Sequence, residues 1–268
     1  MFDKIIGFIG AGNMGSAMIG GILNSSLVTT SQLIVSDPST AVLDKIKSSF
    51  SIDVTTSNER VAERSDVLFL AIKPDKFSEV IPQISQVLKS DCIVVSIAAG
   101  KTISAIESAF GKKVKLVRAM PNTPALVCEA MSALSPNSFV TAEELTQIQE
   151  IFHCFGKSEV VPESMMDAVV GVSGSSPAYV YLFIEAMADA AVADGMPRAQ
   201  AYKFAAQSVY GAAKMVLETG QHPGFLKDMV CSPAGTTIDA VSELEKHGFR
   251  GTVIRAQRAC TKKSREMG

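Results

Sequence analysis

A run of small and hydroxyl-bearing residues, CSPAGTTIDA at residues 231–240, interrupts a helix-rich region near the end of the chain. Its hydroxyls belong to Ser232, Thr236 and Thr237, and Gly235 lies among them. Small residues let another molecule approach the backbone closely. At the start of the helix that follows, the amide groups point outward and favour an anion. The run therefore predicts a loop that binds a carboxylate through amides and hydroxyls.

The sequence GAGNMG, beginning at Gly10, fits the GxGxxG pattern of dinucleotide-binding loops. It follows an apolar run at residues 4–9 and opens a helical pattern, as that pattern requires. Gly10 would form the tight turn, Gly12 would let a pyrophosphate approach the backbone, and Gly15 would allow close helix packing. We predict dinucleotide binding here, the alternative being a purely structural glycine turn.

The form of the dinucleotide is left open by the residues at the end of the second expected strand. Asp37 lies where an acid usually binds the ribose hydroxyls of NAD and repels the extra phosphate of NADP. Ser36, Ser39 and Thr40 could instead donate hydrogen bonds to that phosphate, and Asp37 with Pro38 could form only a turn. Both NADPH and NADH therefore stay open.

Three further strand ends are expected to line the same crevice, because ligands bind outside the carboxyl ends of parallel strands. They are AIKP at residues 71–74, AAG at 98–100 and MPNTP at 120–124. These segments would surround the ribose and the nicotinamide. Each of them could equally be an ordinary turn.

Side chains suited to strong acid–base catalysis are scattered. The three histidines, His153, His222 and His247, have no carboxylate or nucleophile at a suggestive spacing. Glu185 and Asp189 share one face of a helical pattern, but such a pair is commonly the wetter side of a buried helix. No cluster has the spacing of a metal site, so we expect no metal.

The elements that must position these residues alternate along the first half of the chain. Compact β-rich runs alternate with helical patterns, which is typical of an α/β fold with a parallel sheet. Thr141 followed by Glu144 predicts a capping box, for a helix that runs through Phe152 and that Gly156 would close. The expected strands are residues 4–9, 33–35, 67–72, 93–97, 114–117 and 158–161, and the expected helices include 13–23, 76–88 and 102–110.

The second half of the chain is helical and rich in alanine. We place the domain boundary near Pro162, giving a dinucleotide-binding domain at residues 1–162 and an all-helical domain at 163–268. The segment GVSGSSPAY, residues 171–179, is expected to open the first long helix with a serine cap and Pro177 in its first turn. Apolar residues occur nearly all round these helices, so we infer a homodimer or higher homo-oligomer, the alternative being a deeply buried helix.

Composition excludes several classes of function. The 268 residues carry a formal net charge of -2, which gives no electrostatic footprint for nucleic acid. The longest weakly charged run, residues 178–193, is shorter than a membrane span. The five cysteines are widely spaced without a CxxC pair, and the first residues resemble neither a signal nor a transit peptide. We therefore expect a cytoplasmic protein without a membrane partner.

A dinucleotide domain followed by an oligomerising helical domain narrows the reaction to hydride transfer on a small substrate. Oxidation of a hydroxyacid would need a base, commonly a lysine on the first long helix of the second domain. No lysine occurs between Lys157 and Lys203. Reduction of a protonated imine needs positioning more than acid catalysis, which the loop at residues 231–240 could supply.

Five segments together resemble pyrroline-5-carboxylate reductases along essentially the whole chain. They are GFIGAGNMG, AIKP, RAMPNTPA, VVGVSGSSPAYVYLFIEAMADAA and HPGFLKDMVCSPAGTTIDAVSELEKHGFR, of which SPAGTTI is far more discriminating than GxGxxG. The resemblance implies a Rossmann-type domain followed by an all-α dimerisation domain. It also implies reduction of pyrroline-5-carboxylate to L-proline with NADPH or NADH, the last step of proline synthesis, and that oligomerisation is a condition of activity.

The resemblance also implies roles for individual residues. In the substrate site, Ser232, Gly235 and the amides of Thr236 and Thr237 receive the carboxylate, the Thr237 hydroxyl lies near the ring nitrogen, and Glu163 lines the site. Thr237 and Ser232 are thus the candidate catalytic residues. The implied cofactor residues are Gly10, Ala11, Gly12, Asn13, Met14 and Gly15 at the pyrophosphate, Ser36, Asp37 and Ser39 at the adenosine ribose, and Asn58, Ile72, Lys73 and Ala99 along the cofactor.

Two positions depart from the family's pattern. Ala234 stands where many members carry glycine, which matters if the residue needs a positive φ. Asp37 stands where many relatives carry a hydroxyl, so the usual preference for NADPH is open here. The rival functions are a related hydroxyacid dehydrogenase and a non-catalytic dinucleotide-binding protein.

Overall fold

The computed structural model describes residues 2–267, which form two compact units. The first unit comprises the chain up to Ser175 together with the residues from Cys260 onward, and the second comprises Ser176–Ala259. These units are groups of residues in mutual contact, and their limits do not define independently folding domains. The division near Pro162 therefore stays a prediction.

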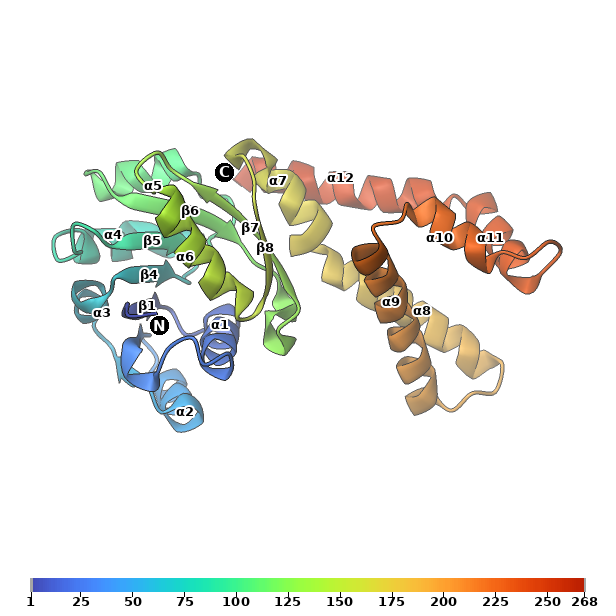
Figure 1. Cartoon of the computed structure of the whole chain (residues 1–268), viewed down its shortest axis with the longest axis horizontal. Coiled ribbons are helices and arrows are strands. Elements are labelled where there is room, and N and C mark those ends of the chain that lie inside the picture. Colours follow the sequence, from blue (N-terminus) through green and yellow to red (C-terminus); the bar gives the residue numbers. More distant parts are fainter. Residues whose placement is uncertain (1, 268) are drawn as a thin grey trace. The chain divides into compact units, whose positions relative to one another are not determined.

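The first unit is built on an eight-stranded sheet in the order β3-β2-β1-β4-β5-β6-β7-β8 (Figure 1). The first six strands of the chain run parallel, with the order of a dinucleotide-binding sheet. The strands are β1 (Ile6–Ile9), β2 (Leu33–Ser36), β3 (Asp53–Thr55), β4 (Val67–Leu70), β5 (Ile93–Ser96), β6 (Lys115–Met120), β7 (Ala130–Pro136) and β8 (Gly156–Val160).

Helices connect these strands and cover both faces of the sheet. The α-helices of this unit are α1 (Asn13–Asn24), α2 (Thr40–Phe50), α3 (Asn58–Arg64), α4 (Phe77–Ser85), α5 (Ile103–Phe110), α6 (Ala142–His153) and α7 (Met166–Val169). Short turns are η1 (Thr30–Gln32), η2 (Pro74–Lys76), η3 (Thr123–Val127), η4 (Glu163–Met165) and the π-helical η5 (Val170–Gly174).

Alternation along the strands divides the core into two layers. On β1, Phe8 packs with α1, α2 and α6, whereas Ile9 packs with α3, α4 and α5 on the opposite face. Phe8 stacks on Phe69 of β4 with ring centroids 4.7 Å apart. Both faces of the central strands are therefore buried, so within the sheet only the strand ends are open to a ligand.

One edge of the sheet and the end of α6 differ from the sequence prediction of a parallel sheet and of a helix closed by Gly156. Strand β7 pairs antiparallel with β6, and β8 runs parallel to β7. Gly156 was expected to close helix α6, but α6 ends at His153 and Gly156 begins β8 instead. A Cβ on Gly156 would lie 2.1 Å from the Ala130 carbonyl oxygen, so this glycine is required by close strand packing.

An ion pair joins the start of β6 to α6. Lys115 Nζ lies 2.5 Å from Glu144 Oε1, and the capping box predicted for Thr141 and Glu144 is confirmed. Burial raises the pKa of Glu144, but the hydrogen bonds from Lys115 and the Thr141 amide outweigh it and lower that pKa overall. This ion pair adds an electrostatic contact to the apolar contacts that hold α6 against the sheet.

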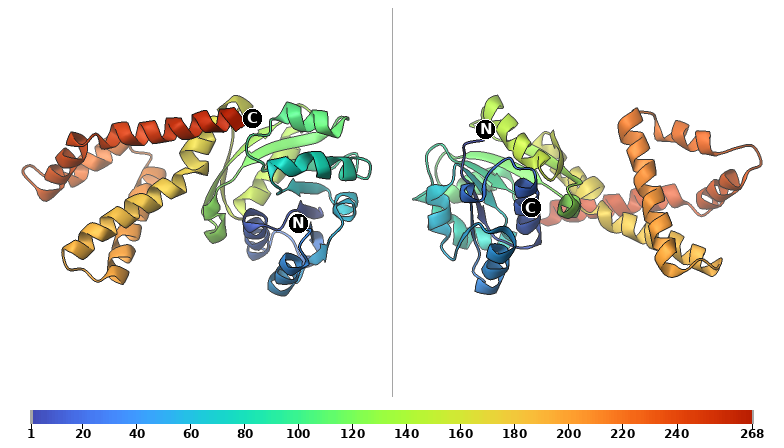
Figure 2. Two further views of the ribbon diagram at one scale, coloured as in Figure 1. Left: turned by 180° about the vertical axis from the view of Figure 1, so that it is seen from behind. Right: turned by 60° about the horizontal axis from the view of Figure 1, so that its bottom comes forward.

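The second unit consists of helices (Figures 1 and 2). Helix α8 forms a hairpin with α9, and Phe183 of α8 contacts Phe249 of α12. Its helices are α8 (Ser176–Ala193), α9 (Arg198–Thr219), α10 (Pro223–Val230), α11 (Thr236–Lys246) and α12 (Phe249–Met267), of which the last residues belong to the first unit.

The second unit buries little of its apolar surface. Within residues 176–259, the buried hydrophobic side chains are Ala188, Ala201 and Ala205. Large side chains such as Leu182 and Leu217 are 68% and 83% exposed. A set of helices with this surface needs further neighbours.

The segment leading into α8 is itself helical. Helix α8 begins at Ser176 with Pro177 in its first turn, as predicted, but the π-helical η5 precedes it. The Ser175 amide donates to the Val170 carbonyl at 2.8 Å, which closes the wider turn. Within residues 2–267, no helix combines the length and the apolar character needed to cross a membrane.

Candidate functional site

The glycine loop between β1 and α1 has the geometry that a pyrophosphate requires. Gly10 has φ +98°, and a Cβ there would lie 2.4 Å from the Ala71 carbonyl oxygen. A Cβ on Gly15 would lie 2.5 Å from the Gly10 carbonyl oxygen, which explains the close packing of α1. A Cβ on Gly12, in contrast, would meet no heavy atom of the described chain within 4 Å. The space beside Gly12 is thus open to a ligand.

The start of α1 is free to interact with an anion. Gly12 is the N-cap, no side chain caps the helix, and no acidic residue lies in its first turn. The amides of the first turn, from Asn13 through Met14, carry the positive end of the helix dipole. The residues present therefore fit a dinucleotide pyrophosphate.

Asp37 is tied to the glycine loop through its carboxylate. Its Oδ2 accepts a hydrogen bond from the Ala11 amide at 3.0 Å, and its Oδ1 accepts one from the Ser39 amide at 2.9 Å. Ser39 is also the N-cap of α2, where its hydroxyl accepts from the Val42 amide. The carboxylate therefore fixes both the glycine loop and the turn after β2.

Ser36 and Asn58 hold each other beside this turn. The buried Ser36 hydroxyl donates to Asn58 Oδ1 at 2.8 Å, and Asn58 Nδ2 donates to Gln83 Oε1 at 2.8 Å. Because the Ser36 proton is used internally, this hydroxyl is not a free donor for a phosphate. Of the three hydroxyls considered for the extra phosphate of NADP, those of Ser36, Ser39 and Thr40, the Ser36 hydroxyl therefore already donates within the protein.

The other cofactor candidates lie at neighbouring strand ends. Ile72 follows β4, and its Cγ2 atom lies 3.2 Å from the position of a Cβ on Gly10. Lys73 is the next residue and precedes η2. Ala99 follows β5 and packs against a small cluster that contains Met120 at the end of β6. The parallel topology brings these ends to the edge that carries the glycine loop.

Glu163, expected in the substrate site, lies in the first unit near the ends of β5 and β6. It begins η4, and its Oε1 accepts hydrogen bonds from the Ile103 amide at 2.7 Å and from Arg118 Nη1 at 2.9 Å. Its side chain is 32% exposed. The carboxylate is therefore anchored on one side and accessible on the other.

Arg118 was not identified from the sequence. Its side chain is only 6% exposed, and its Nε atom has no hydrogen-bond partner. The available signal was a cation inside the apolar strand LVRAM, since a buried arginine requires a carboxylate from elsewhere. Sequence alone gave no means of pairing it with Glu163.

The remaining substrate residues lie in the second unit, in the loop between α10 and α11. Gly235 is the N-cap of α11, and a Cβ there would lie 2.3 Å from Ser232 Oγ. Ala234 has φ +54°, a left-handed conformation that glycine adopts more readily than alanine. Thr236 and Thr237 are the first two residues of α11, and no side chain caps this helix start. The loop thus presents hydroxyls and amides together.

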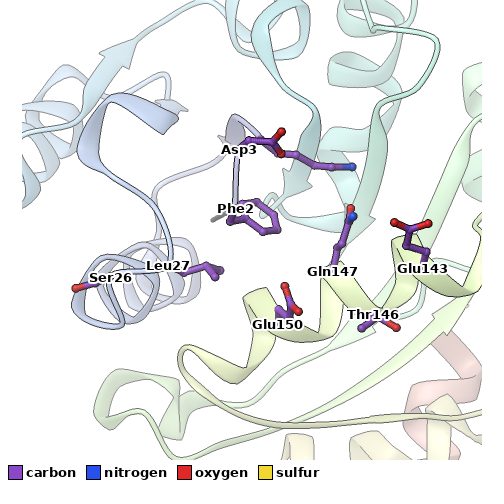
Figure 3. Close-up of a pocket in the computed structure, with 9 residues that line it drawn as sticks. Phe2, Asp3, Ser26, Leu27, Glu143, Thr146, Gln147 and Glu150 are labelled. Carbon is purple, nitrogen blue, oxygen red and sulfur yellow. The ribbon is translucent and has the colours of Figure 1, made fainter.

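A separate pocket of about 700 Å³ is shown in Figure 3. It lies between the N-terminal segment, the turn after α1 and one face of α6, and its lining includes Phe2, Leu27 and Gln147. None of the residues expected to bind substrate or cofactor lines it. Among residues 2–267, no three His, Cys, Asp or Glu side chains come together to hold a metal ion.

Comparison with known proteins gives consistent matches along the chain. A family model described as "Pyrroline-5-carboxylate reductase dimerisation" matches residues 163–267, and one described as "NADP oxidoreductase coenzyme F420-dependent" matches residues 5–100. Pyrroline-5-carboxylate reductase of Escherichia coli (strain K12) is 54% identical over 99% of this chain and 98% of its own length.

More distant relatives agree. Pyrroline-5-carboxylate reductase of Methanosarcina acetivorans is 45% identical over 100% of this chain and 99% of its own. The crystal structure of Plasmodium falciparum pyrroline carboxylate reductase with NADP bound has a TM-score of 0.90 and 35% identity, covering 100% of this chain and 99% of that one. The likeness therefore extends over both units.

Proposed function

The chain belongs to the pyrroline-5-carboxylate reductase family, and from this premise we propose how its residues reduce 1-pyrroline-5-carboxylate to L-proline. It is an NAD(P)H-dependent oxidoreductase, with NADP(H) as its cofactor and NAD(H) as the second cofactor to test. When bound, the reduced cofactor supplies a hydride to the imine carbon. We place the reaction at the last step of proline synthesis.

We propose that the cofactor lies along the strand ends of the first unit. The open space beside Gly12 and the uncapped start of α1 support this assignment. The residues proposed for this role are Gly10, Ala11, Gly12, Asn13, Met14 and Gly15 at the pyrophosphate, Ser36, Asp37 and Ser39 at the ribose, and Asn58, Ile72, Lys73 and Ala99 beyond it.

The observation that carries the assignment of the substrate site is the geometry of residues 232–237. Gly235 leaves room for the Ser232 hydroxyl, and the amides of Thr236 and Thr237 stand at an uncapped helix start. Such a start favours a carboxylate by about 0.3–1 kcal/mol at exposed sites, and hydrogen bonds to the charged group add to this. We propose that this loop holds the carboxylate of the ring.

The chemistry needs little more than positioning. A protonated imine is already electrophilic, and hydride addition at its carbon leaves the electron pair of the C=N bond on the ring nitrogen, which keeps its proton. We propose that the Thr237 hydroxyl hydrogen-bonds near that nitrogen, and that Glu163 lines the site. No strong acid is required at the reacting atoms.

Consumption of NADPH with 1-pyrroline-5-carboxylate tests the activity, and two serine variants test the site. Ser232→Ala should raise KM for the imine, because a donor to its carboxylate is lost. Ser242→Ala is the matched control, since Ser242 lies on α11, the helix that follows the loop, and its hydroxyl donates to the Ile238 carbonyl at 2.8 Å. Equal KM values in both variants and in the wild type would remove the loop from the substrate site.

We propose that the protein acts as a homodimer or a higher homo-oligomer in the cytoplasm. The small apolar core of residues 176–259, with Leu182 and Leu217 exposed, supports self-association through the helical part of the chain. We further propose that this part begins near Pro162 and runs to the end of the chain.

Measurement of the oligomeric state tests this arrangement. Sedimentation across a range of protein concentrations should give dimers or larger assemblies at the concentrations where the enzyme turns over. Leu217→Glu should shift the equilibrium towards monomer and lower activity in parallel. Full activity in a strictly monomeric preparation would contradict the proposal.

A further inference from the structure

A buried arginine lies in the half of the sheet formed by β4, β5 and β6. Arg118 sits on β6 between Ser96 of β5 and Ser135 of β7, both of which are buried and uncharged. Among residues 2–267, Glu163 is its only ionic partner. A guanidinium buried in this way depends on that carboxylate, because an unpaired buried charge is strongly unfavourable.

The two donors to Glu163 converge on one oxygen. Arg118 Nη1 and the Ile103 amide both bind Oε1, while Oε2 has no hydrogen-bond partner among the described residues. Arginine–carboxylate pairs are frequently bidentate, with each oxygen engaged. A pair whose only role was to neutralise charge would gain most from that geometry. Here one oxygen is left for another donor.

The location of this pair relates it to the reaction. Ile103 begins α5, directly after the turn that contains Ala99, and Arg118 lies two residues before the end of β6. In a sheet of this order, the half formed by β4, β5 and β6 binds the second mononucleotide of the cofactor. In such sheets that mononucleotide carries the nicotinamide, so we expect the hydride to leave the cofactor on the side of the sheet where Glu163 lies.

We propose that Arg118 is a positioning residue for imine reduction. It holds Oε1 of Glu163, and so keeps Oε2 available to accept a hydrogen bond from the N–H of the protonated ring. This inference rests on the proposed function, because it concerns how that same substrate is oriented. The arginine itself does not touch the substrate.

The physical reason is that a free glutamate side chain has several rotamers, and only some would direct a carboxylate oxygen at the ring. Two fixed donors on Oε1 select one arrangement before the substrate arrives. Lysine could supply the charge, but it lacks the planar fork that fixes direction.

Steady-state kinetics of the full-length oligomer test the proposal, with the imine and NADPH varied separately. Arg118→Met should lower kcat/KM for the imine roughly 10- to 100-fold, the range expected when a reacting group is misplaced. The dissociation constant of NADPH should change less than about twofold, because the pyrophosphate loop is untouched. Arg118→Lys should recover part of the loss.

A double-mutant cycle separates positioning from independent effects. Glu163→Gln should lower kcat/KM for the imine to a similar extent. The double variant of Arg118→Met and Glu163→Gln should have a kcat/KM that is less than about twofold below that of the less active single variant. Additive losses would overturn the proposal, since they would mean that Arg118 does not act through Glu163.

Lys115→Met is the matched control, because it breaks another partly buried ion pair on the same strand. It should lower the melting temperature without changing kcat/KM for the imine. If Arg118→Met behaves in the same way, Arg118 is only structural and the proposal fails. If Arg118→Met does not fold, the same comparison is made with Arg118→Lys and Glu163→Gln. Absence of turnover by the wild type would refute the proposed function instead.

Discussion

Ala234 is held in a conformation that alanine adopts only at a cost. Its φ of +54° places it in the left-handed region, directly before the N-cap of α11. For an L-residue with a Cβ this conformation costs about 1–2 kcal/mol, because Cβ approaches the carbonyl oxygen. Replacing Ala234 with glycine should therefore stabilise the folded protein.

The gain is smaller than the strain because glycine also loosens the unfolded chain. That effect opposes stability by about 0.4–1 kcal/mol, so Ala234→Gly should raise the free energy of unfolding by about 0.5–1 kcal/mol. Ala240 offers a matched control, since it is also exposed and lies inside α11. Ala240→Gly should lower the free energy of unfolding by about 1 kcal/mol, through loss of helix propensity.

Urea denaturation at one fixed protein concentration measures the difference, because self-association makes apparent stability depend on concentration. The free energies of unfolding of the two glycine variants should lie on opposite sides of the wild-type value and differ from each other by about 1.5–2 kcal/mol. If both variants lose the same stability, Ala234 does not occupy the left-handed region in solution. The reasoning about this loop would then be wrong.

Four other variants test the cofactor loop and the ion pair on α6. Asp37→Ser should shift the ratio of kcat/KM for NADPH over NADH towards NADPH by about fivefold, because one repulsive contact near 4 Å in water is worth about 1 kcal/mol; an unchanged ratio would count against Asp37 as the residue that distinguishes the cofactors. Gly12→Ala should fold normally but weaken NADPH binding, measured by fluorescence titration, since its Cβ would occupy the open space beside the loop. Gly15→Ala should instead lower the free energy of unfolding by about 1–3 kcal/mol, because its Cβ would overlap a backbone oxygen; equal behaviour of the two variants would contradict this assignment. Glu144→Gln should destabilise the protein at neutral pH. Because the pKa of Glu144 is lowered from its ordinary value of 4.5, the ionised carboxylate stabilises the folded wild type above that pH. The difference in unfolding free energy between the wild type and Glu144→Gln should therefore narrow as pH falls below 4.5. A difference that is independent of pH would refute this linkage.

The parts of the fold that are fixed by local rules could be predicted from the sequence. The strand, glycine loop and helix that begin the chain follow from one apolar run and three glycines, each with a separate steric reason. The capping box at Thr141 follows likewise from residues three apart. In both cases, neighbours in the sequence supply all the contacts that decide the structure.

The reversed edge of the sheet could not be predicted in the same way. Strand β7 reads AMSALSP, and its buried Ser132 and Ser135 break the apolar pattern that normally marks a buried strand. Its direction is decided by pairing with β6, which is a tertiary contact. Strand β3 is only three residues long and has no buried side chain, so it gives little signal.

The candidate site shows the same limit. The glycine loop was visible as a motif, and residues 232–237 were visible as an unusual cluster of small residues and hydroxyls. The pair of Arg118 and Glu163 was not, because 45 positions separate the two residues in the chain. An isolated arginine within an apolar strand indicates that a carboxylate must pair with it, but the sequence does not identify that carboxylate.

The two candidate binding regions differ in what holds them rigid. The glycine loop belongs to a sheet whose central side chains, such as Phe8 and Phe69, are fully buried within one chain. The loop at residues 232–237 belongs to helices whose buried hydrophobic side chains are alanines, so its own unit supplies little packing to fix it. Preorganisation of a binding loop requires that its supports be fixed first. Self-association of the helical unit is therefore expected to matter more for holding the imine than for binding the nucleotide.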